Sequence, residues 1–288
     1  MPDLPADLPG LTLDAVGPLE RAVVETDACR GAVFAHGAHV SAWQPAGHDP
    51  VLWMSSKAEY RDGKAIRGGV PVCFPWFGPK ADDPDAPAHG TVRTKAWDWL
   101  DATHKDGVTT VSLTTHADPF TVNFTAGFGP TLDLRLTVML IGTASAPAAF
   151  EAALHTYLAV DDVREVTIAG LEQSQYIDKM LDGAPTCDPA GQPIRFTAET
   201  DRVYLDVDRP SVLTDPGLGR RITIDHQAPS VVVWNPWIDK ATRMGDFGDD
   251  EWPGMCCIET GAIGPDAITL EPGEGVSLGV SIRVEPTG

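Results

Sequence analysis

The stretch TLDLRLTVML, residues 131–140, alternates apolar and polar side chains with a period of two. Leu132, Leu134 and Leu136 fall on one face of an extended chain, and Asp133 falls on the other. Such alternation is typical of a strand with one face buried. The sequence therefore predicts a β-strand here, with its leucines packed against a core.

The same pattern recurs along the chain, for example in SLGVSIRVE at 277–285 and VTTVSL at 108–113. Twenty-eight glycines and 25 prolines interrupt the sequence too often for long helices, and no linker separates two halves of different composition. So many strands would leave exposed sheet edges, which are protected by closing a sheet into a barrel or by stacking two sheets. We therefore expect residues 1–288 to form a single all-β domain, a large antiparallel sandwich or barrel.

The chain is strongly acidic. Its 21 Lys and Arg residues against 41 Asp and Glu residues give a formal net charge of −20, which argues against nucleic acid as a partner. No apolar run approaches the roughly 18 residues of a membrane-spanning helix, and MPDLPADLPG at 1–10 lacks the regions of a signal peptide. We expect a cytoplasmic protein that binds no membrane.

Familiar cofactor and metal motifs are missing from the sequence. The five cysteines and eight histidines show no CxxC, HxH or HExxH spacing, and there is no nucleophile elbow, phosphate loop or dinucleotide motif. The acidic run Asp246, Asp249, Asp250 and Glu251 lacks the alternating frame of a calcium loop, so we expect a solvated turn. We predict no cofactor and no catalytic metal.

The segment KAIRGGVPVCFPWFGP, residues 64–79, is too rich in proline for a central strand. We expect a rigid, irregular segment in which Gly68 and Gly69 let the backbone approach a ligand and Arg67 binds an anion. The alternative is a packed loop with a surface arginine. The aromatic residues expected along one wall of such a site are Phe74, Trp76 and Phe77.

A second basic point lies in AHGTVRTKAWDW, residues 88–99, where Arg93 and Lys95 follow His89. Positive charge is conspicuous in so acidic a chain. Arg67 and Arg93, from separate segments, could together form forked bonds to a phosphate or a carboxylate. From the residues alone, they could equally be unrelated surface groups.

The run AFEAALHTYLAV, residues 149–160, is predicted to be one strand with His155 in its middle. His155 shares its face of this strand with Ala153 and Tyr157. Ala153 is small and so leaves room for a ligand over the imidazole ring. Histidine is the side chain best suited to exchange protons near neutral pH. A purely structural histidine is the alternative.

Glu259 stands inside the otherwise apolar run MCCIET, residues 255–260, on the face that Met255 and Cys257 share. A carboxyl group in such a strand is costly to bury unless it has partners or a task. Glu259 is therefore a candidate functional residue.

Taken together, these segments resemble the aldose 1-epimerase superfamily and, within it, the hexose-6-phosphate mutarotases. The resemblance extends over residues 20–283, which we expect to form the core of the domain, and it implies a β-supersandwich of galactose-mutarotase type. The blocks that carry it follow the family's order: RGGVPVCFPWFGP (67–79), HGTVRTKAW (89–97), LHTYLAV (154–160), YIDK (176–179), ETDRVY (199–204) and WNPWIDKATRMGDFGDDEW (234–252) with CIET (257–260).

The resemblance also implies an activity, the cofactor-free interconversion of the α and β anomers of a hexose 6-phosphate such as D-glucose 6-phosphate. His155 corresponds to the general acid, ionised as imidazolium, and Glu259 to the general base, ionised as carboxylate. Arg67 and Arg93 correspond to the groups that hold the phosphate. The other site residues implied are Asp201, on the sugar hydroxyls, and His89, in the same pocket. We expect a monomer that binds this small molecule.

The chain departs from the family at one block, which usually reads HGFAR after a polar residue. Here Ala88 precedes HGTVR, so a side-chain contact is lost or made by the backbone. Three other functions stay open. They are a mutarotase of unphosphorylated aldoses, a non-catalytic carbohydrate-binding protein, and a lyase or hydrolase, which would need a second carboxylate near the first.

Overall fold

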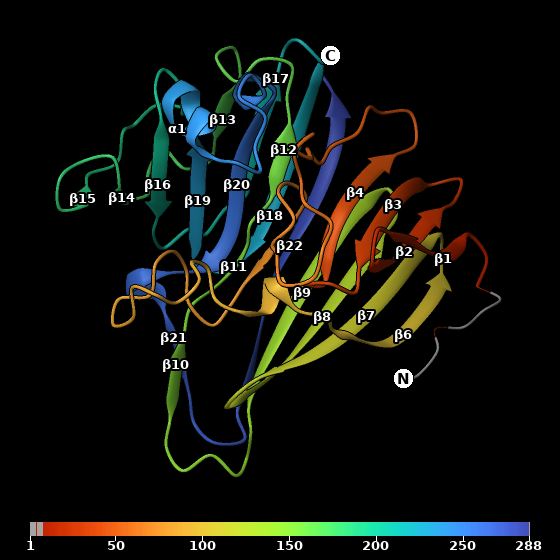
Figure 1. The fold of residues 1–288 in the computed structure, drawn as a ribbon. Helices are drawn as coiled ribbons and strands as arrows, with labels where there is room; N and C mark the ends of the chain where they lie inside the picture. The colour runs from red at the N-terminus through yellow and green to blue at the C-terminus, as the bar shows by residue number, and fades with distance from the viewer. Residues whose placement is uncertain (1–3, 5–7, 288) are drawn as a thin grey trace.

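The computed structural model describes Leu4 and residues 8–287, and strands are the main regular structure among them (Figure 1). The strands form two eight-stranded sheets, one four-stranded sheet and one two-stranded sheet. Their pairings are antiparallel, as in β18 with β22 and β19 with β20. The prediction of an all-β, antiparallel fold is confirmed.

One eight-stranded sheet, which we name the site sheet, has the order β15-β14-β16-β19-β20-β11-β5, and β12 also pairs with β20. It occupies the upper left of Figure 1. Its strands are β5 (Val72–Cys73), β11 (Ala152–Leu154), β12 (Tyr157–Ala159), β14 (Tyr176–Asp178), β15 (Thr186–Cys187), β16 (Thr200–Tyr204), β19 (Ser230–Asn235) and β20 (Met255–Ala262).

The other eight-stranded sheet, named the back sheet, has the order β13-β17-β18-β22-β9-β8-β7-β6. The leucines of β9 are buried while Asp133 and Arg135 are exposed, so the predicted alternation is confirmed. Its strands are β6 (Asp98–Lys105), β7 (Val108–Ala117), β8 (Phe120–Phe128), β9 (Thr131–Leu140), β13 (Thr167–Ala169), β17 (Ser211–Asp215), β18 (Arg220–Gln227) and β22 (Gly275–Pro286).

The two large sheets pack against each other over an apolar core that includes a short polar bridge. Thr260 on β20 and Ser211 on β17 contact the two ring nitrogens of His226 on β18, at 2.7 and 2.9 Å. Because both ring nitrogens have partners, the hydrogen-bonding groups of this histidine are satisfied inside the sandwich. It is a structural residue that ties the site sheet to the back sheet.

The four-stranded sheet covers one end of the back sheet (Figure 1). A Cβ atom on Gly31 would lie 2.3 Å from the Phe128 ring, so only glycine allows β3 to approach β8 this closely. The remaining elements are β1 (Leu11–Val16), β2 (Leu19–Glu25), β3 (Cys29–Phe34), β4 (His39–Pro45), β10 (Ala148–Phe150), β21 (Ile268–Leu270), the helix α1 (Trp237–Arg243) and three 3₁₀ turns, η1 (Val92–Thr94), η2 (Trp252–Gly254) and η3 (Gly264–Asp266).

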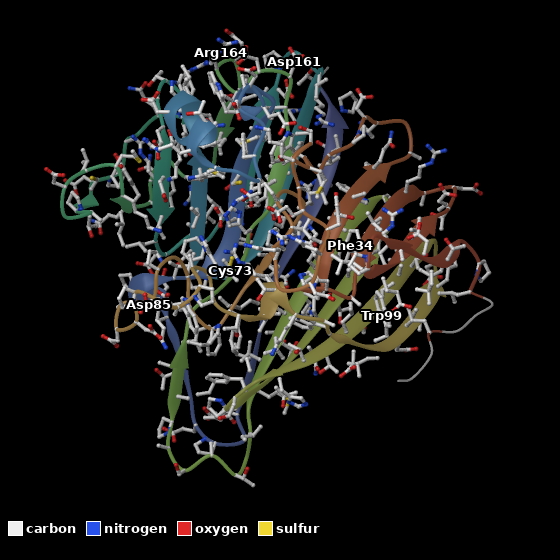
Figure 2. The ribbon with its side chains drawn as sticks, in the orientation of Figure 1. Phe34, Cys73, Asp85, Trp99, Asp161 and Arg164 are labelled. Carbon is white, nitrogen blue, oxygen red and sulfur yellow. The ribbon has the colours of Figure 1, made fainter. Side chains whose placement is uncertain are left out.

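Residues 64–79 form the irregular segment that the sequence predicts, with only β5 as regular structure. Cys73 on β5 is fully buried and lies near the middle of the molecule, whereas Arg164 lies at its upper edge (Figure 2). Gly68 and Gly69 have a structural reason to be glycines. Cβ atoms there would lie 2.5 Å from the Trp53 carbonyl oxygen and 2.2 Å from that of Val40, so these glycines let neighbouring backbone approach. Their approach to a ligand stays a prediction.

All five cysteines are free. In the part of the chain that the structure describes, none of the helices has the length and hydropathy of a membrane-spanning segment.

Candidate active site

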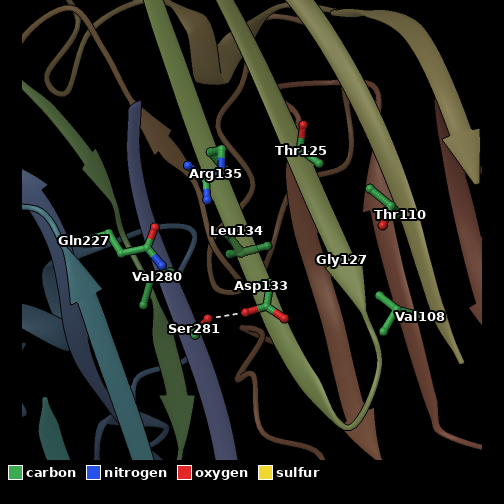
Figure 3. A pocket seen from close by; sticks show the side chains of 10 residues that line it. All are labelled: Val108, Thr110, Thr125, Gly127, Asp133, Leu134, Arg135, Gln227, Val280 and Ser281. Carbon is green, nitrogen blue, oxygen red and sulfur yellow. Dashed lines mark hydrogen bonds between the residues drawn. The ribbon is translucent and has the colours of Figure 1, made fainter. Parts of the chain in front are cut away.

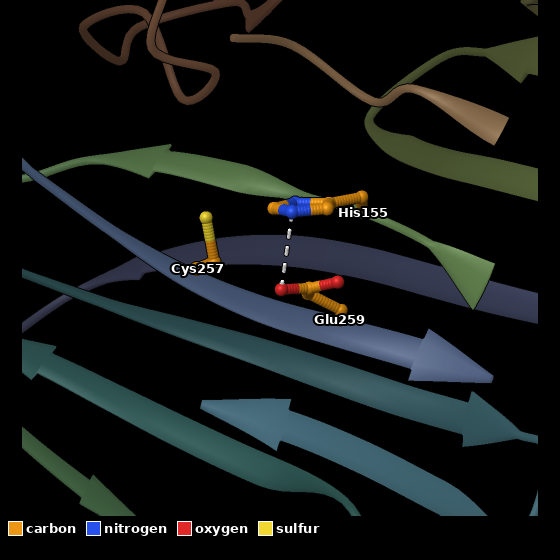
Figure 4. Close-up of side chains that lie close together, drawn as sticks. All are labelled: His155, Cys257 and Glu259. Carbon is orange, nitrogen blue, oxygen red and sulfur yellow. Dashed lines mark ion pairs between the residues drawn. The ribbon is translucent and has the colours of Figure 1, made fainter. Parts of the chain in front are cut away.

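The predicted strand over residues 149–160 is divided into three short strands, β10, β11 and β12, and His155 lies in the break between β11 and β12. β11 and β12 both pair with β20, and the pairing of Leu154 with Thr260 continues in register across this break. His155 therefore lies opposite Glu259, with 3.4 Å between its Nε2 atom and the Oε1 atom of the carboxyl group (Figure 4). Strand pairing has joined two residues that are far apart in the sequence.

Both members of this pair are buried, with side-chain exposures of 8% for His155 and 1% for Glu259. Burial lowers the pKa of His155 well below its ordinary value, and neighbouring basic groups lower it further. Burial also raises the pKa of Glu259 well above its ordinary value. Burial therefore favours the neutral form of each group at rest. The carboxylate and the imidazolium that the resemblance implies for the reaction stay a prediction.

The pair opens into a cavity of about 370 Å³, a size typical of small-molecule sites. The structure brings together around it all the site residues that the sequence predicts: Arg67, His89, Arg93, His155, Asp201 and Glu259. Some of these residues lie in loops and others lie in strands of the site sheet. All six therefore line one shared cavity.

Arg67 is fixed on two sides at the cavity wall. Its Nε and Nη2 atoms donate to Oδ2 of Asp246 at 3.2 and 3.1 Å, and Nη1 donates to the Tyr157 hydroxyl at 2.8 Å. Burial opposes the charge, but these partners raise the pKa of the guanidinium above its ordinary value. Arg67 is therefore a permanent, oriented cation.

The acidic run at 246–251 is only partly the solvated turn that we expected. Asp249 and Asp250 are exposed in a turn, and Asp249 pairs with Lys57 at 2.6 Å. Asp246 instead holds Arg67, and Glu251 accepts a hydrogen bond from the backbone of Ser56 at 3.0 Å. These carboxylates fasten the run to the loop that precedes Arg67.

Arg93 lies in η1 on another wall of the cavity. Its Nη2 atom donates to the Ala88 carbonyl at 2.8 Å, so the backbone makes a contact at the position where the chain departs from the family that it resembles. Its Nε atom is buried and has no hydrogen-bond partner among the described residues.

His89 is held in one tautomer. The backbone N–H of Gly78 donates to its Nδ1 atom at 3.3 Å, so the proton of the neutral ring is on Nε2. Burial, with a further contribution from the charge of Arg93, lowers the pKa of His89 to about 3. His89 is therefore a neutral hydrogen-bond donor at neutral pH.

Two lysines of the cavity were missed from the sequence. Lys179 lies 3.8 Å from Asp201, and Lys240 pairs with Glu199 at 3.0 Å. Burial raises the pKa of Asp201, and both lysines oppose that shift. A signal was available, because the tripeptide Ile-Asp-Lys occurs at 177–179 and again at 238–240 in a chain with few basic residues.

The predicted aromatic wall is only partly correct. Phe77 lines the cavity and contacts the ring of His89 edge to face at 4.7 Å. Phe74 is fully buried in the core instead, against Phe120 and Phe150. Trp76 points away and donates to the Pro87 carbonyl at 3.0 Å.

His155, Cys257 and Glu259 also form a cluster of potential metal ligands, whose ligand atoms lie within 4.8 Å of one another (Figure 4). Sequence spacing could not reveal this cluster, because strand pairing assembles it. A thiolate, an imidazole and a carboxylate are all ligand types that zinc accepts. His155 and Glu259 also have the right chemistry to transfer protons directly.

A second cavity, of about 300 Å³, lies on the back sheet, where Ser281 donates to Asp133 and Arg135 lies nearby (Figure 3). It contains none of the predicted site residues and no histidine. The cavity around His155 and Glu259 is therefore the candidate active site.

Comparison with known proteins agrees with this geometry. Residues 22–283 match the family model described as aldose 1-epimerase. The chain is 36% identical to a "putative glucose-6-phosphate 1-epimerase" of Escherichia coli K12, over 96% of this chain and 94% of that protein. A relative with the same description in Cenchrus ciliaris is 31% identical, over 85% and 78% of the two chains.

Solved structures show the same fold. A crystal structure of a "putative mutarotase" from Salmonella typhimurium aligns with a TM-score of 0.89 at 29% identity, over 97% of this chain and 95% of that one. Galactose 1-epimerase from Lactobacillus acidophilus aligns with a TM-score of 0.75 at 14% identity, over 96% and 98%, and this likeness concerns the fold alone. The predicted galactose-mutarotase architecture is confirmed, and the chain belongs to the aldose 1-epimerase family.

Proposed function

We propose that this protein interconverts the α and β anomers of D-glucose 6-phosphate. The observation that carries the proposal is the placement of His155 and Glu259, 3.4 Å apart, in a cavity that two arginines also line. The relatives described as glucose-6-phosphate 1-epimerases support the choice of substrate.

Anomer interconversion requires two proton transfers. A base removes the proton of the O1 hydroxyl while an acid protonates the ring oxygen O5, so that the ring opens to an aldehyde. Rotation about the C1–C2 bond and reclosure then give the other anomer. One acid and one base suffice, and each typically contributes about 10²- to 10⁴-fold to the rate.

In this scheme Glu259, as carboxylate, accepts the O1 proton and His155, as imidazolium, donates to O5. Ring opening leaves a neutral carboxyl and a neutral imidazole, which are the forms that burial favours. Reclosure uses those same neutral forms in the reverse direction. The pair therefore completes the cycle with a single shared proton and needs no external donor.

Phosphate binding by Arg67 and Arg93 would change the electrostatics of the pair. The charges of both arginines lower the pKa of His155, and the charge of Arg93 also lowers the pKa of Glu259. A bound phosphate dianion compensates those charges, so it favours the imidazolium and also the neutral carboxyl group. Binding energy from this non-reacting group would also hold the sugar in register for proton transfer.

Asp201 and His89 would contact the sugar itself. Asp201 offers carboxylate oxygens to hydroxyl groups, and His89 offers the N–H that its tautomer leaves on Nε2. We further propose that the protein acts as a single-domain monomer in the cytoplasm, without metal or cofactor.

The test follows freshly dissolved α-glucose 6-phosphate toward anomeric equilibrium by polarimetry, after subtraction of the spontaneous rate, with free glucose and galactose in parallel. Faster equilibration of the phosphate ester than of either free sugar supports the proposal. Equal acceleration of all three would indicate an epimerase of unphosphorylated aldoses. Binding of the ester with no acceleration would indicate a carbohydrate-binding protein.

A further inference from the structure

The orientation of the His155 ring is not set in the way that is usual for catalytic histidines. Such a ring is commonly oriented by a hydrogen bond at its second nitrogen. Here Nε2 faces Glu259, and Nδ1 is buried with no hydrogen-bond partner within the described ranges. Another contact has to fix the plane of this imidazole.

That contact is an aromatic stack with Tyr157. The two rings lie 4.7 Å apart and are almost parallel, with 7° between their planes. The ring of Trp234 meets both of them edge to face, with centroids 6.1 Å from His155 and 6.0 Å from Tyr157. Stacking against a rigid neighbour restricts rotation of the imidazole and so keeps Nε2 directed toward Glu259.

Tyr157 is itself held at both ends. Its side chain is 1% exposed, and its ring stacks on Trp53 with centroids 5.7 Å apart. Its hydroxyl accepts the hydrogen bond from Nη1 of Arg67, whose other nitrogens are bound to Asp246. One residue therefore contacts both the imidazole and the guanidinium.

We propose that Tyr157 is a positioning residue that joins the phosphate-binding arginine to the acid–base pair. Its ring orients His155, and its hydroxyl orients Arg67. This inference rests on the proposed function. It implies that a phosphate group bound at Arg67 raises kcat as well as affinity, because the guanidinium and the imidazole are fixed by the same side chain.

The experiment uses two substitutions that separate the two contacts. Tyr157→Phe keeps the stack and removes the hydroxyl, whereas Tyr157→Leu removes the stack as well. Tyr204→Phe is the matched control, because Tyr204 is similarly buried in the site sheet but its ring packs on Tyr176 and not on His155. Circular dichroism and urea unfolding check that each variant is folded.

Each variant is assayed on glucose 6-phosphate, on free glucose, and on free glucose with added phosphite dianion. Tyr157→Phe should raise KM for the ester about tenfold, as for a lost bond to a charged group, and should affect free glucose much less. Phosphite should accelerate the reaction of free glucose in the wild type and clearly less in Tyr157→Phe. Tyr157→Leu should lower kcat on both sugars by about a hundredfold, within the range of an acid–base contribution.

Two results would overturn the inference while leaving the proposed function intact. One is an active wild type whose folded Tyr157 variants behave like Tyr204→Phe on every substrate. The other is an equal loss on both sugars in Tyr157→Phe, with phosphite activation unchanged. A wild type that accelerates neither sugar would instead refute the proposed function, and this inference with it.

Discussion

The imidazole of His155, between β11 and β12, and the carboxyl group of Glu259 on β20 face each other 3.4 Å apart, and both line the same cavity. The register of β20 with β11 and β12 fixes this relationship. Burial favours the neutral form of both groups.

Glu259→Gln should stabilise the protein at alkaline pH even though it removes the proposed base. The unfolded chain ionises Glu259 near its ordinary pKa, whereas the folded protein retains that proton to higher pH because burial raises the pKa. The folded state then binds more protons, so its free energy of unfolding falls as pH rises. Glutamine does not titrate and keeps a similar shape.

We therefore expect Glu259→Gln to raise the free energy of unfolding by roughly 1 to 3 kcal/mol at pH 8, and by less at pH 5. Urea unfolding of the wild type and the variant at both pH values checks this. A gain that is larger at pH 5 would mean that the pKa of Glu259 is not raised.

The activity should be constant through neutral pH and fall at both extremes. Protonation of His155 beside a neutral Glu259 removes the base, and the lowered pKa of His155 places this loss below pH 6.5. Loss of the shared proton removes the acid, and the raised pKa of Glu259 places that loss above pH 4.5.

The check is the pH dependence of kcat/KM on free glucose, because the phosphate group of the ester itself ionises with a pKa of about 6. An acid limb above pH 6.5 would contradict the lowered pKa of His155.

Arg67→Ala and Arg93→Ala should each raise KM for glucose 6-phosphate by about 10- to 100-fold, as expected for a lost bond between charged groups. The effect on free glucose should be small. Lys95→Ala is a matched control, because Lys95 follows Arg93 closely but its ammonium binds the His116 carbonyl outside the cavity. Equal losses on both sugars would show that the arginines do not hold the phosphate.

The aromatic residues of the segment 64–79 should contribute unequally to the stability of the protein. Phe74→Ala removes a fully buried ring between Phe120 and Phe150 and should lower the free energy of unfolding by about 3 to 5 kcal/mol. Trp76→Ala removes a partly exposed ring and should lower the free energy of unfolding by roughly half of that amount or less. Urea denaturation measures the free energy of unfolding of both variants. A larger decrease for Trp76→Ala than for Phe74→Ala would show that Trp76, and not Phe74, packs in the core.

The strands were predictable where one face is buried and the other exposed, because a period of two is a local property of the sequence. Residues 131–140 are the clearest case. The break at His155 was not predictable. The backbone N–H of His155 donates to the Pro71 carbonyl at 3.0 Å, and a contact with so distant a segment leaves no trace in local alternation. Residues 152–158 are also buried on both faces.

The site was predictable as a set of residues and not as an arrangement. Individually, His155, Glu259 and the two arginines were ambiguous, and the family resemblance united them. Their partners stayed hidden, because Asp246 binds Arg67 and Lys179 approaches Asp201 only after distant strands have paired. The aromatic wall failed for a similar reason, since packing alone decides which ring of a proline-rich segment enters the core.

The central claim is that His155 and Glu259 transfer the two protons as a unit. NMR exchange spectroscopy on glucose 6-phosphate at anomeric equilibrium measures the α-to-β rate without a coupling enzyme. His155→Ala and Glu259→Gln should each reduce the catalysed rate by about 10²- to 10⁴-fold, and the double variant should be no slower than the slower single variant. Folded single variants that retain the wild-type exchange rate would contradict the claim.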